Sequence, residues 1–268
     1  MGTRKDFLTN SIWAVSGVSF LSFLPAAEAQ KLTKQLQRAA SQPAVQTAGD
    51  ETFWQSIREQ YSISPDIINL NNGGVNPQPI PVQEAYIKNY KYCNLGPSHY
   101  MWHKLDNDRE PLRKKLAELA GCDTEELAIN RNTTEGLNTI IFGLDLKEGD
   151  EVVLSKYDYP NMMNAWRQRA RRDKIVLKWI DLNLPLTNED EIVQLYSNAI
   201  TERTRIVHIT HMLNWTGQIL PAQKITAVAH TKGCEVILDA SHSFAHIPLN
   251  FKSIGCDYAA SSLHKWTG

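Results

Sequence analysis

The sequence predicts an α/β protein built on a mainly parallel sheet with helices on both faces. From residue 127 onwards, apolar runs of strand length alternate with helical patterns of roughly ten residues, which is the spacing of crossover connections between parallel strands. The expected strands are residues 127–130, 151–155, 175–180, 205–210, 235–238 and 258–261. The expected helices between them are residues 134–144, 160–172, 189–200 and 222–231.

The composition is that of an ordinary globular protein. The chain has 268 residues, of which 42% are hydrophobic and 21% charged, and this length allows one large domain or two modest ones. Its 28 Lys+Arg nearly balance 29 Asp+Glu, so charge gives no reason to expect nucleic acid or an anionic membrane surface as a partner. The four cysteines are too few for a disulfide scaffold, and we interpret them as buried small residues: Cys93, Cys122, Cys234 and Cys256.

The start of the chain has the three parts of a secretory signal. Arg4 and Lys5 precede an apolar run at residues 12–24, and an Ala-Glu-Ala cleavage pattern follows at residues 27–29. The apolar run is shorter than the ~20 residues that span a bilayer as a helix. The start also resembles the twin-arginine motif, with Lys5 in place of the second Arg. We therefore expect an export signal over residues 1–29 and a periplasmic or secreted protein. The alternative is a cytoplasmic protein, or one that an uncleaved signal tethers to the membrane.

Between the signal and the alternating region, the pattern is mostly helical. We expect a helical segment and linker over residues 30–65, in which Asp50 or Thr52 caps a helix through residues 53–57. The large domain is expected over residues 66–268. It begins with a short strand at 67–70, the Asn-Asn-Gly-Gly loop at 71–74, a helix to residue 94, and a helical stretch at 100–120 that is broken near Pro111 and stopped by Gly121.

Polar residues follow the expected strands, and ligands in such sheets bind beyond the carboxyl ends of the strands. Lys265 follows the last strand and Asp239 the one before it. Thr133 is a good N-cap for the helix at 134–144, and a helix N-terminus suits a phosphate, although Glu135 would repel one if its side chain turned inward. Each feature has an ordinary alternative when taken alone: a solvated lysine, a turn-forming aspartate and a plain capped helix.

Taken together, these residues match one cofactor. Pyridoxal 5'-phosphate needs a lysine for a Schiff base, an acid against its pyridine nitrogen, a phosphate cup and flat groups on its ring faces. The sequence places candidates for all four at strand ends of one sheet. It therefore predicts a pyridoxal-phosphate site.

Four residues at the last strand make a more specific match. Ser262-Leu263-His264-Lys265 resembles the Ser-x-His-Lys motif of the class V aminotransferase family, which includes cysteine desulfurases, selenocysteine lyases and isopenicillin-N epimerases. The resemblance runs from about residue 68 to the end of the chain and implies the large domain of fold-type-I pyridoxal-phosphate enzymes. It also implies that Lys265 forms the Schiff base, while Ser262 and His264 hold the phosphate.

The resemblance assigns further roles around the cofactor. Asp239-Ala240-Ser241-His242 resembles the family's Asp-x-x-Gln/His, in which Asp239 would meet the ring nitrogen, Ala240 would pack under the ring and His242 would bond the ring oxygen. Asn214 in an Asn-x-x-Gly match would also face that oxygen. The phosphate-binding turn of the family is matched by Thr133 and Thr134.

Two matches favour one branch of the family. The segment Asp158-Tyr159-Pro160 resembles a Glu-His-His sequence, so Tyr159 would stack on the ring where the desulfurases have a histidine. The 71–74 loop, with Asn72 and Gly73, resembles a loop near the substrate in the epimerase branch. The resemblance therefore implies an amino-acid substrate, an external aldimine, epimerase-like or aminotransferase chemistry, and a homodimer. Cysteine desulfurase or selenocysteine lyase activity is the alternative.

Two rival interpretations come from other features. His242 and His246 lie four residues apart near Asp239, as zinc ligands on a helix do, but the stretch reads as a loop and we expect no metal. The chain also ends three residues after Lys265, where the family continues into a smaller domain with a substrate-binding Arg. We therefore expect a truncated chain, for which a catalytically incompetent cofactor-binding fragment is the alternative.

Overall fold

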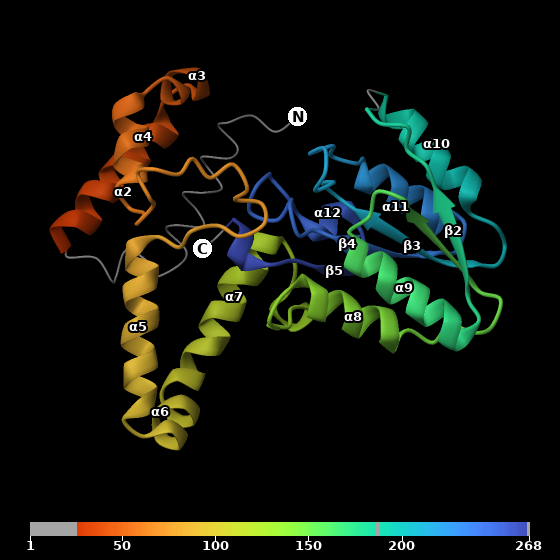
Figure 1. The fold of residues 1–268 in the computed structure, drawn as a ribbon, viewed down its shortest axis with the longest axis horizontal. Helices are drawn as coiled ribbons and strands as arrows, with labels where there is room; N and C mark the ends of the chain where they lie inside the picture. Colours follow the sequence, from red (N-terminus) through yellow and green to blue (C-terminus); the bar gives the residue numbers. More distant parts are fainter. Residues whose placement is uncertain (1–25, 186–187, 267–268) are drawn as a thin grey trace. The chain divides into compact units, whose positions relative to one another are not determined.

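The computed structural model describes residues 26–185 and 188–266, and Figure 1 shows them as a ribbon. They form two compact units. Unit 1 comprises the described parts of Met1–Ile129, Ala245–Leu249 and Leu263–Gly268, and unit 2 comprises Asn130–Phe244 and Asn250–Ser262. The domain boundaries expected from the sequence, at 29/30 and 65/66, stay predictions.

Unit 2 is built on a five-stranded sheet in the order β2-β1-β3-β4-β5. All four neighbouring pairs are parallel, which confirms the predicted sheet. Each strand lies within one or two residues of its expected position. The strands are β1 (Glu151–Ser155), β2 (Val176–Ile180), β3 (Thr204–Thr210), β4 (Glu235–Asp239) and β5 (Tyr258–Ala260).

Helices cover both faces of this sheet, as the sequence predicts (Figure 1). One face carries α8 (Thr133–Gly143) and α9 (Pro160–Asp173), and the other carries α10 (Glu189–Ala199) and α11 (Ala222–Thr231), with the short α12 (Phe251–Ile254) beside α11. The buried core between the sheet and the first pair contains Leu137, Ile141, Val152, Leu154, Trp166, Ile206 and Ile237. Burial of these side chains at about 25 cal/mol per Å² is the main force that holds the layers together.

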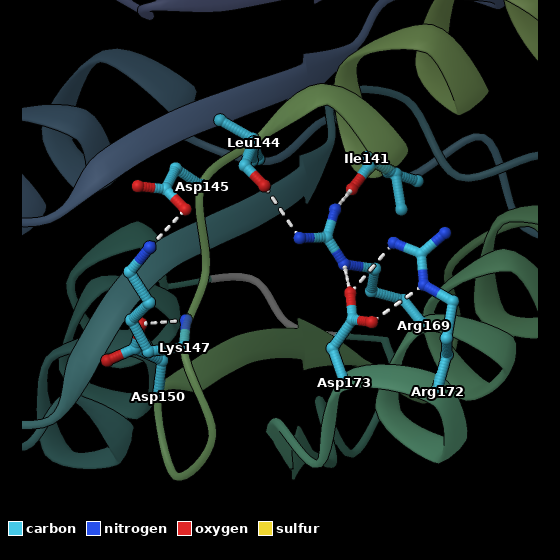
Figure 2. Close-up of polar contacts among 8 residues, drawn as sticks. All are labelled: Ile141, Leu144, Asp145, Lys147, Asp150, Arg169, Arg172 and Asp173. Atoms are coloured by element: carbon cyan, nitrogen blue, oxygen red, sulfur yellow. Dashed lines mark hydrogen bonds and ion pairs between the residues drawn. The ribbon is translucent and has the colours of Figure 1, made fainter.

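A buried arginine joins the two helices of that face (Figure 2). Arg169 of α9 is 3% exposed. Its guanidinium donates to the carbonyls of Ile141 and Leu144 at the end of α8, the second at 2.6 Å, and it pairs with Asp173. Asp173 also accepts two hydrogen bonds from Arg172, at 2.6 and 2.8 Å. The guanidinium thus satisfies carbonyls that the helix end leaves without partners.

Two expected strands do not form. Residues 127–130 are extended without pairing, after the 3-10 turn η3 (Thr124–Glu126), and residues 67–70 are irregular. Ile68 and Leu70 are 87% and 91% exposed. A short apolar run becomes a strand only when a neighbouring strand pairs with it, and neither segment has one among the described residues.

Unit 1 is helical in the described residues. Its helices are α2 (Ala26–Ser41), α3 (Ala44–Ala48), α4 (Glu51–Arg58), α5 (Ile80–Asn94), α6 (Pro97–His103) and α7 (Arg109–Ala120), with the 3-10 turn η2 (Leu105–Asp108) before α7. Asp50 caps α4 as expected, because its side chain accepts from the Phe53 N–H at 3.0 Å. Gly121 ends α7 with φ 68°.

The structure differs from the sequence-based expectation at the helix break and at the cysteines, and it leaves most of the expected signal undescribed. The break in the helical stretch lies at η2 and not at Pro111, which sits in the first turn of α7, where no backbone N–H is needed. Only Cys234 is buried, while the other three cysteines are half-buried. Most of the expected signal, residues 1–25, lies outside the described residues, and its cleavage pattern falls in the first turn of α2. Within the described ranges, no helix combines the length and the hydropathy needed to cross a bilayer.

Candidate active site

Asp239 ends β4 at the carboxyl edge of the sheet. In the strand register it lies between Thr210 of β3 and Ala260 of β5. It is 3% exposed, and its Oδ1 accepts hydrogen bonds from the backbone N–H of Ser241 at 2.9 Å and from its hydroxyl at 2.5 Å. This local turn, which short acidic side chains favour, fixes the carboxylate at the strand end.

The first turn of α8 forms a second polar group at the same edge. The Thr133 N–H donates to the Ser262 hydroxyl at 2.8 Å, and the two hydroxyl oxygens lie 2.6 Å apart. Both residues are 5% exposed. Because Ser262 follows β5 and Thr133 begins α8, this contact brings two hydroxyls together at a helix N-terminus, an arrangement that suits a phosphate.

The expected cap of this helix is wrong by one residue. The N-cap is Asn132, whose side chain accepts from the Glu135 N–H at 3.0 Å. Thr133 is the first helical residue, so its side chain is available to Ser262, whereas Thr134 is exposed.

Glu135 is held by Arg131. Its carboxylate accepts from the Arg131 backbone N–H at 2.6 Å and lies 3.5 Å from the Arg131 Nε. The hydrogen bond from that backbone N–H lowers the pKa of Glu135, and the Arg131 charge lowers it further. The repulsion of a phosphate that the sequence suggested is therefore weakened, because the carboxylate is engaged by a cation at the surface.

Gly136 lets α8 approach the end of β5. A Cβ at this position would lie 2.8 Å from the Asn130 Nδ2 and 3.1 Å from the Ala260 Cβ. A side chain here would displace the Asn130 side chain and press against Ala260, so glycine allows the first turn of α8 to lie close to β5.

The other predicted cofactor residues of unit 2 follow three strands at this edge. Ala240 is fully buried beside Asp239, and its N–H donates to the Ala260 carbonyl at 2.9 Å. Tyr159, after β1, is 39% exposed and immediately precedes α9. Asn214 is exposed at the start of a turn after β3, and His242 is half-buried in the turn after β4.

The remaining predicted residues belong to unit 1. His264 and Lys265 lie in the 3-10 turn η4 (Leu263–Lys265), with Lys265 half-buried. The Asn76 N–H donates to the His264 carbonyl at 2.9 Å, so the segment that follows Asn72 and Gly73 runs beside η4. Asn72 is fixed in turn, because its side chain accepts from the Asn69 Nδ2 at 2.6 Å.

Sequence reasoning missed several polar residues at this edge. Ser241 orients Asp239, and Asp158, His208 and Thr210 lie buried behind it. The available signal was His208, a polar residue in the middle of an apolar strand. In the part of the chain that the structure describes, no group of three or more His, Cys, Asp or Glu side chains could hold a metal ion.

Comparison with known proteins gives one family. Its model, aminotransferase class-V, matches residues 68–268. The chain is 31% identical over 218 residues to isopenicillin N epimerase of Amycolatopsis lactamdurans, covering 80% of this chain and 54% of the epimerase. It is 26% identical over 223 residues to a probable cysteine desulfurase of Synechocystis, covering 78% of this chain and 52% of that protein.

Solved structures agree with the sequence relatives. A lysine-to-alanine mutant of C-DES, with glycine covalently linked to its PLP cofactor, matches with a TM-score of 0.74 and 28% identity, over 78% of this chain and 56% of that one. The cysteine desulfurase CsdA of Escherichia coli matches with a TM-score of 0.69 and 25% identity, over 79% and 54%. The chain spans about half the length of the curated relatives it matches. It belongs to the class V aminotransferase family of pyridoxal-phosphate-dependent enzymes, as its sheet of fold type I and its motifs predict.

Proposed function

We propose that this chain supplies the cofactor-binding large domain of a pyridoxal-phosphate enzyme that acts on an amino acid. The observation that carries the proposal is Asp239, a carboxylate buried at a strand end with Oδ1 fixed by Ser241. A buried carboxylate needs a cationic or hydrogen-bonding partner, and a protonated pyridine nitrogen is such a partner.

Bound pyridoxal phosphate supplies an electron sink for the bonds at the α-carbon of an amino acid. Asp239 holds a proton at the ring nitrogen through a charge-assisted contact worth about 2–3 kcal/mol. Ser241 keeps Asp239 in the orientation that this contact needs. In our proposal Asn214 and His242 bond the ring oxygen, and Tyr159 and Ala240 pack on the two ring faces.

Thr133, Thr134, Ser262 and His264 bind the phosphate in this proposal. Thr133 and Ser262 are already paired at the N-terminus of α8, where backbone N–H groups and the helix dipole favour an anion. Lys265 carries the cofactor and then takes the proton from the substrate α-carbon as a general base. Asn72 and Gly73 contact the substrate.

Among reactions that begin with loss of this proton, we favour isopenicillin-N-epimerase-like or aminotransferase chemistry. Two features support this choice: 31% identity to an isopenicillin N epimerase, and Tyr159 where the sequence resemblance places a histidine of the desulfurases. Cysteine desulfurase or selenocysteine lyase activity is the second candidate, supported by the desulfurase relatives and structures.

Cofactor loading tests the first part of the proposal. We expect the purified chain to bind pyridoxal phosphate with visible absorbance, and borohydride to fix the cofactor on Lys265. Lys265→Ala should lose both signals, while Lys252→Ala, a change at an exposed lysine of α12, should keep them. Stoichiometric labelling of another lysine in the Lys265→Ala variant would contradict the assignment.

Proton exchange tests the second part. In deuterium oxide, the loaded chain should place deuterium at the α-carbon of its amino-acid substrate. In the presence of a thiol reductant, release of sulfide or selenide from cysteine or selenocysteine, with alanine as the other product, would favour the second candidate. Cofactor binding without exchange on a panel of amino acids would instead support a non-catalytic binding fragment.

We also propose export through residues 1–29, leaving a mature chain that starts near Gln30, and assembly as a homodimer. Intact-mass measurement of protein recovered from the periplasm or medium tests the first statement, and retention of Met1 or Gly2 would contradict it. Light scattering at several concentrations tests the second, which a constant monomer mass would contradict.

A further inference from the structure

A second polar group lies buried behind Asp239 in unit 2. His208 and Thr210 point to one face of β3, because side chains two residues apart share a face, and Thr210 pairs in register with Asp239. His208 is 0% and Thr210 3% exposed. The Trp166 ring of α9 meets the His208 ring edge-on, with centroids 6.3 Å apart. The group therefore lies between the sheet and α9, in the core beneath the candidate site.

Asp158 joins this group from the connection between β1 and α9. It is 1% exposed, and its Oδ2 accepts from the Ser155 N–H at 2.8 Å. Within the described ranges its Oδ1, both ring nitrogens of His208 and the Thr210 hydroxyl form no hydrogen bond of normal geometry, although the Thr210 hydroxyl lies close enough to favour the charged form of Asp158. A buried polar atom without a hydrogen bond destabilises the folded state, so we expect the members of this cluster to form hydrogen bonds with one another.

The surroundings of Asp158 act on the charge of its carboxyl. Burial raises the pKa of the Asp158 carboxyl and the nearby Asp239 carboxylate raises it further, while His208, the Thr210 hydroxyl and the Ser155 N–H act in the opposite direction. From the other face, Tyr196 of α10 is buried, and burial together with the Asp158 charge raises its pKa well above the ordinary value. The titratable groups of this cluster in the described part of unit 2 are thus the carboxyls of Asp158 and Asp239, the imidazole of His208 and the phenol of Tyr196.

We propose that Asp158 keeps its proton at neutral pH and uses it to donate a hydrogen bond to an imidazole nitrogen of His208. Burial disfavours the charged form of a carboxyl, and a hydrogen bond from the neutral form to an acceptor favours the neutral form further. Asp158 is then a positioning residue. For the cofactor the inference rests on the proposed function, because a neutral Asp158 places no second negative charge beside the Asp239 side chain that would face the ring nitrogen.

Infrared spectroscopy of the cofactor-free protein tests the proton directly. We expect the wild-type protein at neutral pH to show the C=O stretch of a protonated carboxyl, and Asp158→Asn to lose it. Asparagine has nearly the same shape and no charge, so this variant should fold. His208→Leu should keep the band but shift its frequency, because the hydrogen bond to the imidazole is gone. Absence of the band, or an unchanged band in Asp158→Asn, would overturn the proposal.

The pH dependence of stability gives a second readout. When a carboxyl has a raised pKa in the folded state, the folded protein binds more protons than the unfolded chain above the ordinary Asp range of about pH 4, and stability falls as pH rises. Asp158→Asn removes this contribution. Its urea midpoint should therefore rise relative to that of the wild type, and this gain should grow as the pH increases from about 4 to about 7. Thr226→Val, which removes another buried hydroxyl without a partner in the described residues, should show no such gain.

These measurements separate the inference from the proposed function. Both use protein without cofactor, so the band and the pH dependence report on Asp158 whether or not pyridoxal phosphate binds. A constant difference in midpoint between wild type and Asp158→Asn at all pH values would contradict the neutral carboxyl. Failure of the chain to bind pyridoxal phosphate, with the band present, would contradict the proposed function alone.

Discussion

The hydroxyl oxygens of Thr133 and Ser262 lie 2.6 Å apart although the residues are separated by 129 positions in the chain. Ser262 also accepts from the Thr133 N–H. The contact joins the first turn of α8 to the end of β5. It is formed in the structure without a ligand, so this part of the candidate site is already assembled. A phosphate that binds here meets hydroxyls that are already held in position, so less ordering entropy is lost on binding.

Removal of either hydroxyl should weaken cofactor binding. A hydrogen bond to a charged group contributes about 1.5–3 kcal/mol, so Thr133→Ala and Ser262→Ala should each lower the affinity for pyridoxal phosphate roughly 10- to 100-fold. Thr133→Ser keeps the hydroxyl and should bind nearly as tightly as wild type. Titration of the cofactor-free chain, followed by absorbance, measures the effect. Thr139→Ala, on the exposed side of α8, is the control; equal affinities in all variants would show that the phosphate binds elsewhere.

Asp239 should support α-proton exchange through its charge, and Ser241 should support it by orienting the Asp239 carboxylate. Asp239→Asn removes a contact of about 2–3 kcal/mol, so α-proton exchange in deuterium oxide should slow roughly 30- to 150-fold. Ser241→Ala leaves the charge in place and frees only Oδ1, so a loss of about fivefold is expected for a hydrogen bond of about 1 kcal/mol. Ser253→Ala on α12 serves as the control. A larger effect for Ser241→Ala than for Asp239→Asn would reverse the roles given to them.

Gly136 and Gly143 offer a matched pair on α8. A Cβ at Gly136 would meet Asn130 and Ala260 at 2.8 and 3.1 Å, whereas at Gly143 it would meet nothing within 4 Å. Gly136→Ala should therefore destabilise the chain by about 1–3 kcal/mol, the usual cost of overpacking, and weaken cofactor binding by separating Thr133 from Ser262. Gly143→Ala should leave both unchanged or raise stability slightly. Urea unfolding and cofactor titration of the two variants measure this, and equal behaviour would argue against the close packing of α8 on β5.

Periodic elements could be predicted from the sequence because their own residues determine them. The apolar runs of β1 and β3, and the helical pattern of α11, were placed within a residue of their observed bounds. Residues 127–130 carry a similar short apolar run, but they find no partner strand in the described residues. The pairing of a short strand is decided by distant segments, which a local pattern does not contain.

In the candidate site, too, local sequence predicts some residues, whereas contacts between distant segments determine the others. Lys265 and Asp239 could be identified because each follows a strand and belongs to a motif. Asn132 and Thr133 are both good N-caps, so the sequence could not decide which one caps α8 and which one turns to Ser262. Asp158 was visible only as part of a sequence resemblance. Its closeness to His208 and Asp239 comes from three separate strands meeting at one edge, and only the folded sheet reveals it.

Asp173 should make the α8–α9 contact sensitive to acid. Hydrogen bonds from Arg172, with the charge of Arg169 beside them, lower the pKa of Asp173 to about 2. Because the folded pKa lies below the ordinary value of about 3.8, the contribution to stability is complete above that value and is lost as pH falls toward 2. Asp173→Asn should lower the urea midpoint at neutral pH and flatten its decline between about pH 4 and pH 2.

Asp145→Asn is the control. It removes a carboxylate that is 85% exposed and paired with Lys147 (Figure 2). Exposed pairs contribute little to stability, so its curve should follow the wild type. If the Asp173→Asn curve also ran parallel to the wild type down to pH 2, the ion pairs around Arg169 would not stabilise the folded chain through this carboxylate.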